Sequence, residues 1–167
     1  MLKVLVVDDA QDKLRRVLNC LLTVPGCSAD AIDNARDGVE ARRLLREKQY
    51  DLLVLDIALP ERPNELPAPD GGIRLLEEVF ERDVYNRPRD IVGLTAFPDI
   101  RETAGRRFAE DLWLVIQYEP ESDRWEEQLR RRVRHIVLAK RGAGRFLSTD
   151  ATCVLLRRYR SRNFRRC

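Results

Sequence analysis

The sequence predicts an α/β domain built on a doubly wound, five-stranded parallel sheet with helices on both faces. With 167 residues, the chain is long enough to bury one hydrophobic core. Five short apolar runs rich in Val, Ile and Leu occur between residues 4 and 116, and such runs are typical of strands buried on both faces. Helix-period segments lie between and after them, which favours parallel strands joined by right-handed crossovers.

The individual elements follow from these patterns in chain order. The expected strands, of which the second is the weakest, are residues 4–7, 27–32, 52–55, 91–94 and 112–116. The expected helices, where apolar residues recur at spacings of three and four, are residues 14–21, 39–45, 73–80, 100–108 and 125–137. Gly142 and Gly144 are expected to end the last helix.

Composition excludes several classes of protein. No apolar run approaches the roughly 20 residues that span a bilayer, and the N-terminus lacks the order of regions found in a signal peptide. We therefore expect a cytoplasmic protein with no membrane partner. The four cysteines include no C-x-x-C pair, and His135 has no cysteine near it. This spacing argues against a zinc site and against a thioredoxin-like site.

Charge is distributed unevenly along the chain. Residues 129–167 carry thirteen basic residues and one acidic residue, whereas residues 1–128 carry a net charge of −9. We therefore divide the chain into a main domain, 1–140, and a short basic C-terminal extension, 141–167. The arginines of 130–134 are interpreted either as the solvated face of a helix or, with the extension, as a surface for nucleic acid or an acidic protein.

Acidic and hydroxyl residues follow three of the expected strands. Asp8 and Asp9 come after the first strand, Asp56 ends the third, and Thr95 and Ala96 follow the fourth. Because the carboxyl ends of parallel strands meet at one edge, these residues are expected in one crevice. Three adjacent carboxylates need a cation, and their hard oxygens suit Mg²⁺. A carboxylate beside Mg²⁺ is suited to act as a nucleophile toward a phosphoryl group.

Each of these features alone has a simpler explanation, such as helix capping by Asp9 or a turn at Asp56 or Thr95. Their combination is more specific. The segments "KVLVVDD" at 3–9, "DLLVLDIALP" at 51–60, "DGG" at 70–72 and "IVGLTA" at 91–96 together resemble a response-regulator receiver domain of two-component signalling. The resemblance covers about residues 1–140, and it implies the flavodoxin-like strand order 2-1-3-4-5.

The resemblance also implies a function and its residues. Asp56 is expected to accept a phosphoryl group from a sensor histidine kinase or a phosphotransfer protein, making the chain a switch that contacts a downstream protein. Beyond phosphorylating and dephosphorylating itself at Asp56, it is not expected to be an enzyme. Asp8, Asp9, Asp56 and the backbone carbonyl of Ala58 are the implied Mg²⁺ ligands. Thr95 and Ala96 are the implied phosphoryl contacts.

One departure from the family concerns the lysine that follows its fifth strand. Gln117, Tyr118 and Glu119 are the candidates for that place, and none is cationic. If Glu119 points inward, it adds repulsion. If Glu119 faces solvent, another residue such as Arg101 is expected to substitute. The nearest lysine to this place along the chain is Lys140, far along the last helix.

Two further features leave open how the domain acts on its partners. The loop at 60–70 is long and carries four prolines. We interpret it either as a gate or partner-selecting element or as a surface insertion. The missing lysine supports an alternative function, a degenerate receiver that acts as a phosphorylation-independent protein- or nucleic-acid-binding module. A phosphatase is a more distant alternative, since no general acid can be assigned.

Overall fold

The computed structural model describes residues 1–97 and 113–146, with side chains as far as residue 142. Its centre is a five-stranded sheet with the strand order β2-β1-β3-β4-β5, and all neighbouring strands are parallel. The strands are β1 (Val4–Val7), β2 (Ile32–Ala35), β3 (Leu52–Asp56), β4 (Asp90–Thr95) and β5 (Leu114–Gln117). This order confirms the predicted fold class.

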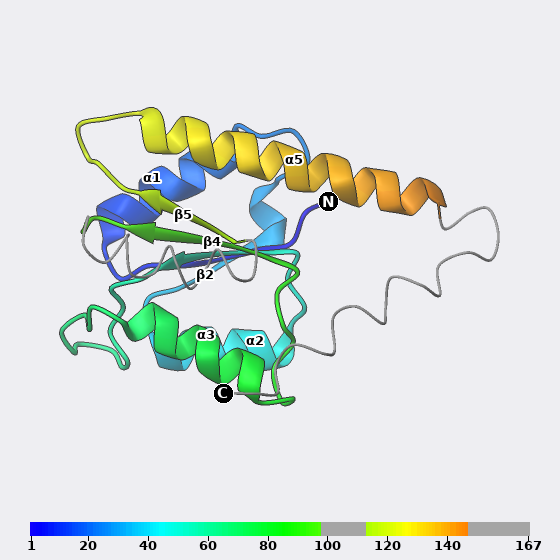
Figure 1. The fold of residues 1–167 in the computed structure, drawn as a ribbon. Helices are drawn as coiled ribbons and strands as arrows, with labels where there is room; N and C mark the ends of the chain where they lie inside the picture. Colours follow the sequence, from blue (N-terminus) through cyan, green and yellow to red (C-terminus); the bar gives the residue numbers. More distant parts are fainter. Residues whose placement is uncertain (98–112, 147–167) are drawn as a thin grey trace.

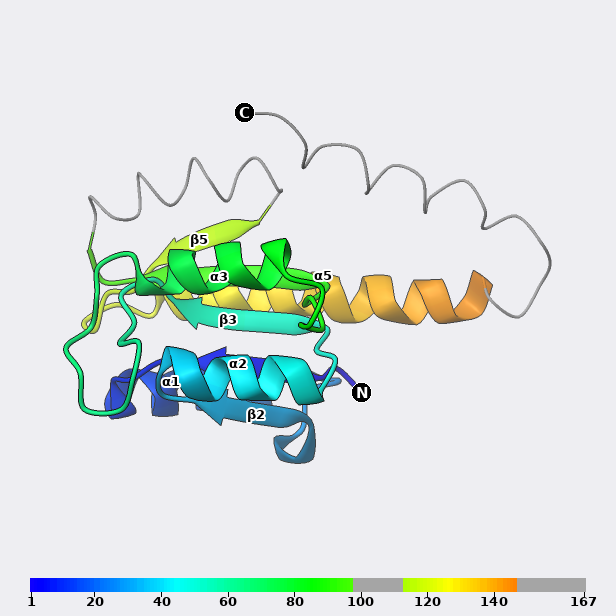
Figure 2. The ribbon, with the colours of Figure 1, turned by 90° about the horizontal axis from the view of Figure 1, so that it is seen from below.

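Helices cover both faces of the sheet. The described helices are α1 (Gln11–Leu22), the short 3₁₀ helix η1 (Ala29–Ala31), α2 (Gly38–Glu47), α3 (Gly71–Glu81) and α5 (Arg124–Phe146). Helices α1 and α5 lie on one face, and α2 and α3 lie on the other (Figure 1). Figure 2 shows the same arrangement from the side of α2 and α3, with the far end of α5 extending beyond the sheet. The helix expected at 100–108 lies outside the described residues.

The two faces of the sheet build two hydrophobic cores. Alternating side chains of β1 divide between them, with Val4 and Val6 packing toward α1 and α5 and with Leu5 and Val7 packing toward α2 and α3. All four are at most 1% exposed. The continuous apolar run in β1 is therefore explained by burial on both sides.

Several element boundaries differ from the sequence predictions. Strand β2 was expected at 27–32 but begins at Ile32, because Gly26 adopts a positive φ of 107° in a turn and η1 follows. Strand β5 was expected at 112–116 and spans Leu114–Gln117 instead. Helix α5 does not end at Gly142 but continues to Phe146. A Cβ at Gly142 would meet nothing within 4 Å, so this glycine lies in open space.

The proposed division at residue 140 stays a prediction, because 147–167 lie outside the described residues. None of the described helices combines the length and the apolar composition of a membrane-spanning segment.

Candidate functional site

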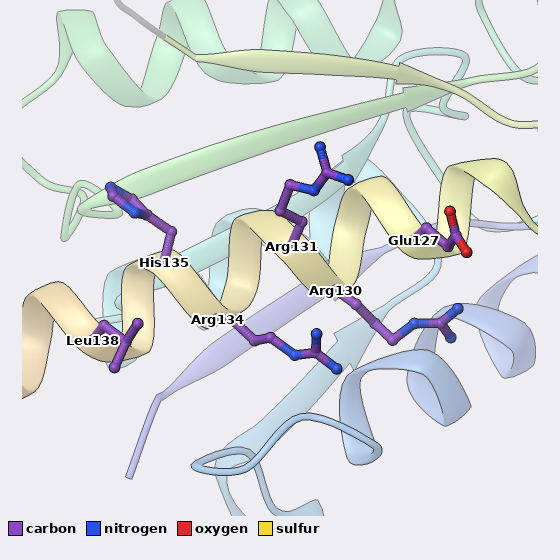
Figure 3. A pocket seen from close by; sticks show the side chains of 6 residues that line it. All are labelled: Glu127, Arg130, Arg131, Arg134, His135 and Leu138. Carbon is purple, nitrogen blue, oxygen red and sulfur yellow. The ribbon is translucent and has the colours of Figure 1, made fainter.

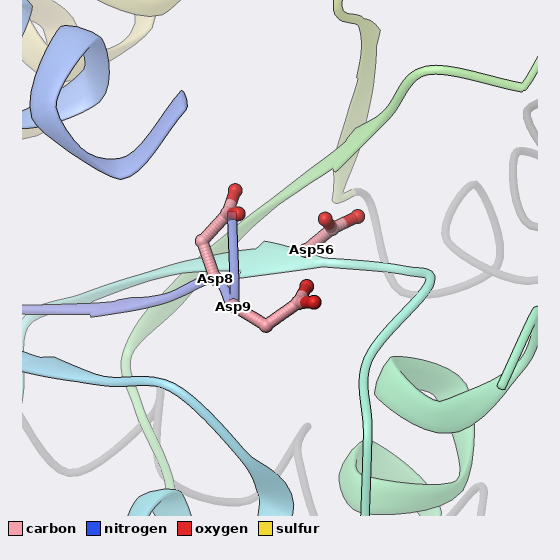
Figure 4. A group of neighbouring side chains, drawn as sticks. All are labelled: Asp8, Asp9 and Asp56. Carbon is pink, nitrogen blue, oxygen red and sulfur yellow. The ribbon is translucent and has the colours of Figure 1, made fainter. Parts of the chain in front are cut away.

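Three aspartates meet at the carboxyl edge of the sheet, as the sequence predicts. Asp8 and Asp9 follow β1, and Asp56 is the last residue of β3 (Figure 4). One carboxylate oxygen from each lies within 4.8 Å of the others. Asp8 and Asp56 are buried, whereas Asp9 is half-buried. The cluster is therefore open to solvent mainly on the side of Asp9.

The chain around Asp56 is held by main-chain hydrogen bonds. Asp56 Oδ1 accepts from Ala58 N at 3.1 Å, and Ile57 N donates to Leu94 O of β4 at 2.9 Å. Gly72 N at the start of α3 donates to Ile57 O at 2.9 Å. A Cβ at Gly72 would lie 2.3 Å from Asp56 O, so only glycine permits this approach. The "DGG" segment thus helps to position Asp56.

A lysine that the sequence analysis missed lies inside the cluster. Lys13 Nζ donates to Asp56 Oδ2 at 2.6 Å and lies 3.0 Å from Asp8 Oδ2. Lys13 is 6% exposed. It follows Asp9 by four residues, about one helical turn, and the immediate start of α1 after β1 directs it back over the strand ends. The four-residue spacing is the sequence signal for this position, but it does not by itself fix where the side chain points.

The electrostatics of the cluster reflect one ammonium among three carboxylates. Burial raises the pKa of Asp8 to about 6, with the Lys13 charge opposing and Asp56 adding to the rise. Burial also raises the pKa of Asp56, against the opposing charge of Lys13. For Lys13 itself burial lowers the pKa, but the two carboxylates outweigh burial and the pKa is raised overall. The ammonium is therefore the stable form of Lys13.

One oxygen of Asp8 is left without a hydrogen bond. Asp8 Oδ1 accepts from Ala10 N at 3.0 Å. Asp8 Oδ2 is buried and lies near Lys13, but no donor within the described part of the chain satisfies hydrogen-bond geometry toward it. The Lys13 ammonium at 3.0 Å is the cation that offsets the charge of this buried oxygen.

The residues after β4 lie beside the cluster. Thr95 is fully buried at the end of β4, and its Oγ1 accepts from Phe97 N at 3.1 Å. Ala96 is exposed. Asp56 pairs in register with Leu94, so Thr95 lies one residue further along the neighbouring strand. The structure thus places Thr95 next to the aspartate edge, with its hydroxyl bonded to its own loop.

The three candidates for the family's lysine position have different surroundings. Gln117 ends β5, Tyr118 is buried, and Glu119 is exposed. The solvent-facing interpretation of Glu119 is therefore supported. The Tyr118 ring centroid lies 5.3 Å from Lys13 Nζ. Arg101 lies outside the described residues. Lys140 pairs with Asp51 at the opposite edge of the sheet.

The proline-rich loop packs onto α2. The carbonyls of Pro60 and Glu61 accept from Gly38 N at 3.0 Å and Val39 N at 3.1 Å, at the N-terminus of α2. Glu61 also forms an ion pair with Arg42 at 2.8 Å. Between this loop, the start of α2 and Asp9 lies a cleft of about 330 Å³. The loop therefore forms one wall of the approach to the aspartates.

A second candidate surface lies on α5. Glu127, Arg130, Arg131, Arg134, His135 and Leu138 line a cavity of about 570 Å³ (Figure 3). Arg130 forms an ion pair with Glu126 at 3.3 Å, whereas Arg131 and Arg134 make no ion pair within the described part of the chain. Residues 130–134 lie on helix α5, and binding of nucleic acid or an acidic protein by these arginines stays a prediction. Most of the basic extension lies outside the described residues.

Comparison with known proteins identifies the family. Residues 4–110 match the response regulator receiver domain. The chain belongs to the response regulator receiver domain family. The matched residues include the three aspartates and Thr95 but end before β5. The family assignment therefore does not depend on the segment that lacks the lysine.

Two relatives resemble this chain in sequence. The protein y4jS of Sinorhizobium fredii is 25% identical over 160 residues, which are 93% of this chain and 38% of that protein. The Detocs response regulatory protein DtcB of Vibrio alginolyticus is 31% identical over 105 residues, which are 58% of this chain and 67% of that protein. This receiver thus spans well under half the length of the Sinorhizobium protein.

Solved structures share the fold. The Mn²⁺-bound response regulator Rcp1 has a TM-score of 0.61 and 19% identity, with 78% of this chain and 90% of that chain covered. The receiver domain of Francisella response regulator 1452 has a TM-score of 0.60 and 21% identity, with 84% and 99% covered. At these identities the likeness establishes the receiver fold alone.

Proposed function

We propose that this receiver is a signalling switch that accepts a phosphoryl group on Asp56. The observation that carries the proposal is the buried Asp56 carboxylate at the carboxyl edge of the sheet, beside two more aspartates and an ammonium. A carboxylate in that position is held close to groups that stabilise a transferred phosphoryl group. The family assignment and the buried Thr95 beside the edge support the same interpretation.

The proposed reaction transfers one phosphoryl group. A carboxylate oxygen of Asp56 attacks the phosphorus of a phosphohistidine, and the N–P bond breaks as the electron pair leaves with the imidazole. The product is an acyl phosphate on Asp56. Attack by water at phosphorus later releases inorganic phosphate and restores the carboxylate. The two steps together restore the free carboxylate of Asp56, and the phosphoryl group resides on the chain between them. The proposed activity is therefore that of a switch with a phosphorylated and an unphosphorylated state.

The residues at this edge fit Mg²⁺. The three aspartates supply hard oxygen ligands, and Asp8 Oδ2 is a buried oxygen without a hydrogen bond. Asp9, Asp56 and the Ala58 carbonyl would hold the ion directly, and Asp8 would hold it chiefly through water. When bound, Mg²⁺ would neutralise charge on the phosphoryl oxygens. The protein Rcp1, whose fold is similar, has been solved with Mn²⁺ bound.

The proposed partners follow from this chemistry. A sensor histidine kinase or a phosphotransfer protein would supply the phosphoryl group, and a downstream protein would bind the phosphorylated form. Because a kinase that uses ATP must share a compartment with its receiver, we infer a cytoplasmic location.

The test is intact mass spectrometry after incubation with Mg²⁺ and phosphoramidate. We expect wild type to gain the mass of one phosphoryl group and Asp56→Ala to gain none. Asp83→Ala is the matched control, because the Asp83 side chain is fully exposed, and it is expected to behave like wild type. A folded wild-type protein that gains no adduct would contradict the proposal and favour a phosphorylation-independent binding module.

A further inference from the structure

The receiver family places a lysine after its fifth strand, and this chain has none there. The described structure nevertheless contains a buried ammonium in contact with the acceptor aspartate. We propose that Lys13 of α1 replaces that lysine and supplies the cation that contacts the phosphoryl group on Asp56. The inference rests on the proposed function, since it assigns a residue to the same reaction.

The contacts of Lys13 are those that the role requires. Its Nζ bridges Asp56 Oδ2 at 2.6 Å and Asp8 Oδ2 at 3.0 Å. Within residues 1–97 and 113–142, no other lysine or arginine forms an ion pair with Asp56. An ammonium has three donor hydrogens. Lys13 is therefore able to keep its ion pair with Asp8 while one N–H donates to a phosphoryl oxygen. Such charge-assisted hydrogen bonds are the strong ones.

The residue that follows β5 packs against Lys13, whose side chain comes from α1. Tyr118 follows β5 directly, and its main-chain N donates to Thr95 O at 2.8 Å. Its ring lies 5.3 Å from Lys13 Nζ and 5.0 Å from the ring of Trp125. An aromatic ring therefore fills the end of the fifth strand and covers the ammonium through a cation–π contact. Of the three candidate positions for the family's lysine, 118 is the buried one and the one whose side chain contacts Lys13. With Lys13 present, a second lysine is not needed there.

Helix α1 is fixed in the position that this role demands. Arg16, one turn after Lys13, forms an ion pair with Glu126 of α5 at 2.7 Å and donates to Pro120 O at 2.6 Å. The Arg16 guanidinium also lies 5.1 Å from the Trp125 ring. These contacts tie α1 to α5 and to the loop after β5. Lys13 is therefore directed at Asp56 from a rigid element rather than from a loop.

The main alternative is a structural role, in which Lys13 only offsets the repulsion of the aspartates. The two roles differ in their effect on phosphorylation. A phosphoryl-contacting cation stabilises charge that develops during transfer, so its loss slows the transfer even when Mg²⁺ restores the charge balance. A merely structural lysine becomes dispensable once Mg²⁺ is bound.

The first arm of the test compares rates of phosphorylation by phosphoramidate at saturating Mg²⁺, measured by intact mass. Lys13→Met is expected to form the adduct on the order of a hundredfold more slowly than wild type. Lys48→Met is the matched control, because Lys48 is half-exposed and pairs with Asp33, and it should match wild type. Circular dichroism of each variant is the check that it is folded.

The double variant Lys13→Met with Tyr118→Lys returns a lysine to the strand end. Recovery of most of the wild-type rate in this variant supports the exchange of one lysine position for the other. It also keeps the proposal testable if Lys13→Met alone folds poorly, since the double variant retains one ammonium in the cluster.

The second arm measures Mg²⁺ affinity by calorimetry and does not depend on phosphorylation. Removing an ammonium beside the aspartates removes repulsion of the ion, so Lys13→Met should bind Mg²⁺ roughly tenfold more tightly, or better. Slow phosphorylation with tighter Mg²⁺ binding supports the proposal. Slow phosphorylation with weaker Mg²⁺ binding would show a damaged site and would overturn it.

The outcomes separate this inference from the proposed function. If wild type and Lys13→Met form the adduct at the same rate, Lys13 is structural and the inference is wrong, while Asp56 remains the acceptor. If wild type forms no adduct, both fail.

Discussion

A lysine pairs with an aspartate at both ends of the parallel strands, which we call the amino edge and the carboxyl edge of the sheet. Donors outnumber carboxylates at the amino edge, and carboxylates outnumber donors at the carboxyl edge. At the amino edge, Asp51 Oδ2 accepts from Lys3 N at 2.8 Å and from Lys140 Nζ, and Arg89 lies 3.8 Å from Oδ1. One carboxylate there has several donors. At the carboxyl edge, the single ammonium of Lys13 serves two of three clustered carboxylates.

The pKa values of the two edges move in opposite directions. Burial would raise the pKa of Asp51, but the hydrogen bonds from Lys140 and Lys3 outweigh burial and lower it. Burial raises the pKa of Asp8 and of Asp56 despite Lys13. A satisfied carboxylate stabilises the fold. Clustered carboxylates with too few donors are instead suited to bind a metal ion.

The largest effect is expected from Gly72→Ala, which disturbs the packing next to Asp56 at the carboxyl edge. The new Cβ would lie 2.3 Å from Asp56 O, so we expect a loss of about 3 kcal/mol in the free energy of unfolding and a slower phosphorylation. Gly142→Ala is the control, because a Cβ there meets nothing within 4 Å. It should stabilise helix α5 by up to about 1 kcal/mol. Urea unfolding measures both, and equal stability of the two variants would contradict the expectation.

The pH dependence of stability should have opposite signs at the two edges. Without divalent cations, the folded state holds a proton on Asp8 up to a pKa of about 6. Stability should therefore fall by about 3 kcal/mol as the pH rises from below 4 to above 6. Asp51 has a lowered pKa, so its contribution is present above about pH 4 and is lost as the pH falls further.

Urea unfolding from pH 3 to pH 8 checks these signs. Asp8→Asn should reduce the loss on the alkaline side and leave the part that comes from the raised pKa of Asp56. Asp51→Asn should reduce the loss on the acidic side, to which the lowered pKa values of Asp33 and Glu78 also contribute. An unchanged alkaline profile in Asp8→Asn would argue against the burial of an unsatisfied carboxylate at this position.

Removing the amino-edge pair should affect only stability. Lys140→Met leaves Asp51 partly unpaired, and because the Lys140 side chain is 38% exposed, we expect a loss of about 1 to 2 kcal/mol. The rate of phosphorylation should stay within about twofold of wild type. A large drop in that rate in the folded variant would break the distinction between the two edges.

Most of the site was predictable because strand ends can be read from the sequence. Apolar runs mark β1, β3 and β4, and the topology of a parallel sheet then brings Asp8, Asp9 and Asp56 together. Strand β2 was placed too early because it is a short edge strand with the sequence IDNA, which lacks a continuous apolar run. Polar edge strands leave little periodic signal.

Lys13 could not be placed from sequence alone. Its direction depends on the start of α1 at Gln11 and on the contacts of Arg16 with α5, which are tertiary contacts 110 residues apart in the chain. A lysine in an amphipathic helix is ordinarily expected at the surface. The packing of the proline-rich loop on α2 could not be predicted from the sequence either. Its hydrogen bonds are accepted by the backbone carbonyls of Pro60 and Glu61, which do not depend on the type of side chain.

The most direct measurement compares Asp56→Asn and Asp51→Asn by intact mass after incubation with phosphoramidate and Mg²⁺. Both substitutions remove one buried carboxylate from β3 or its immediate start, at opposite edges of the sheet. We predict one phosphoryl adduct on wild type and on Asp51→Asn, and none on Asp56→Asn. An adduct on Asp56→Asn, or its loss from a folded Asp51→Asn, would contradict the assignment of the carboxyl edge as the phosphoryl-accepting site.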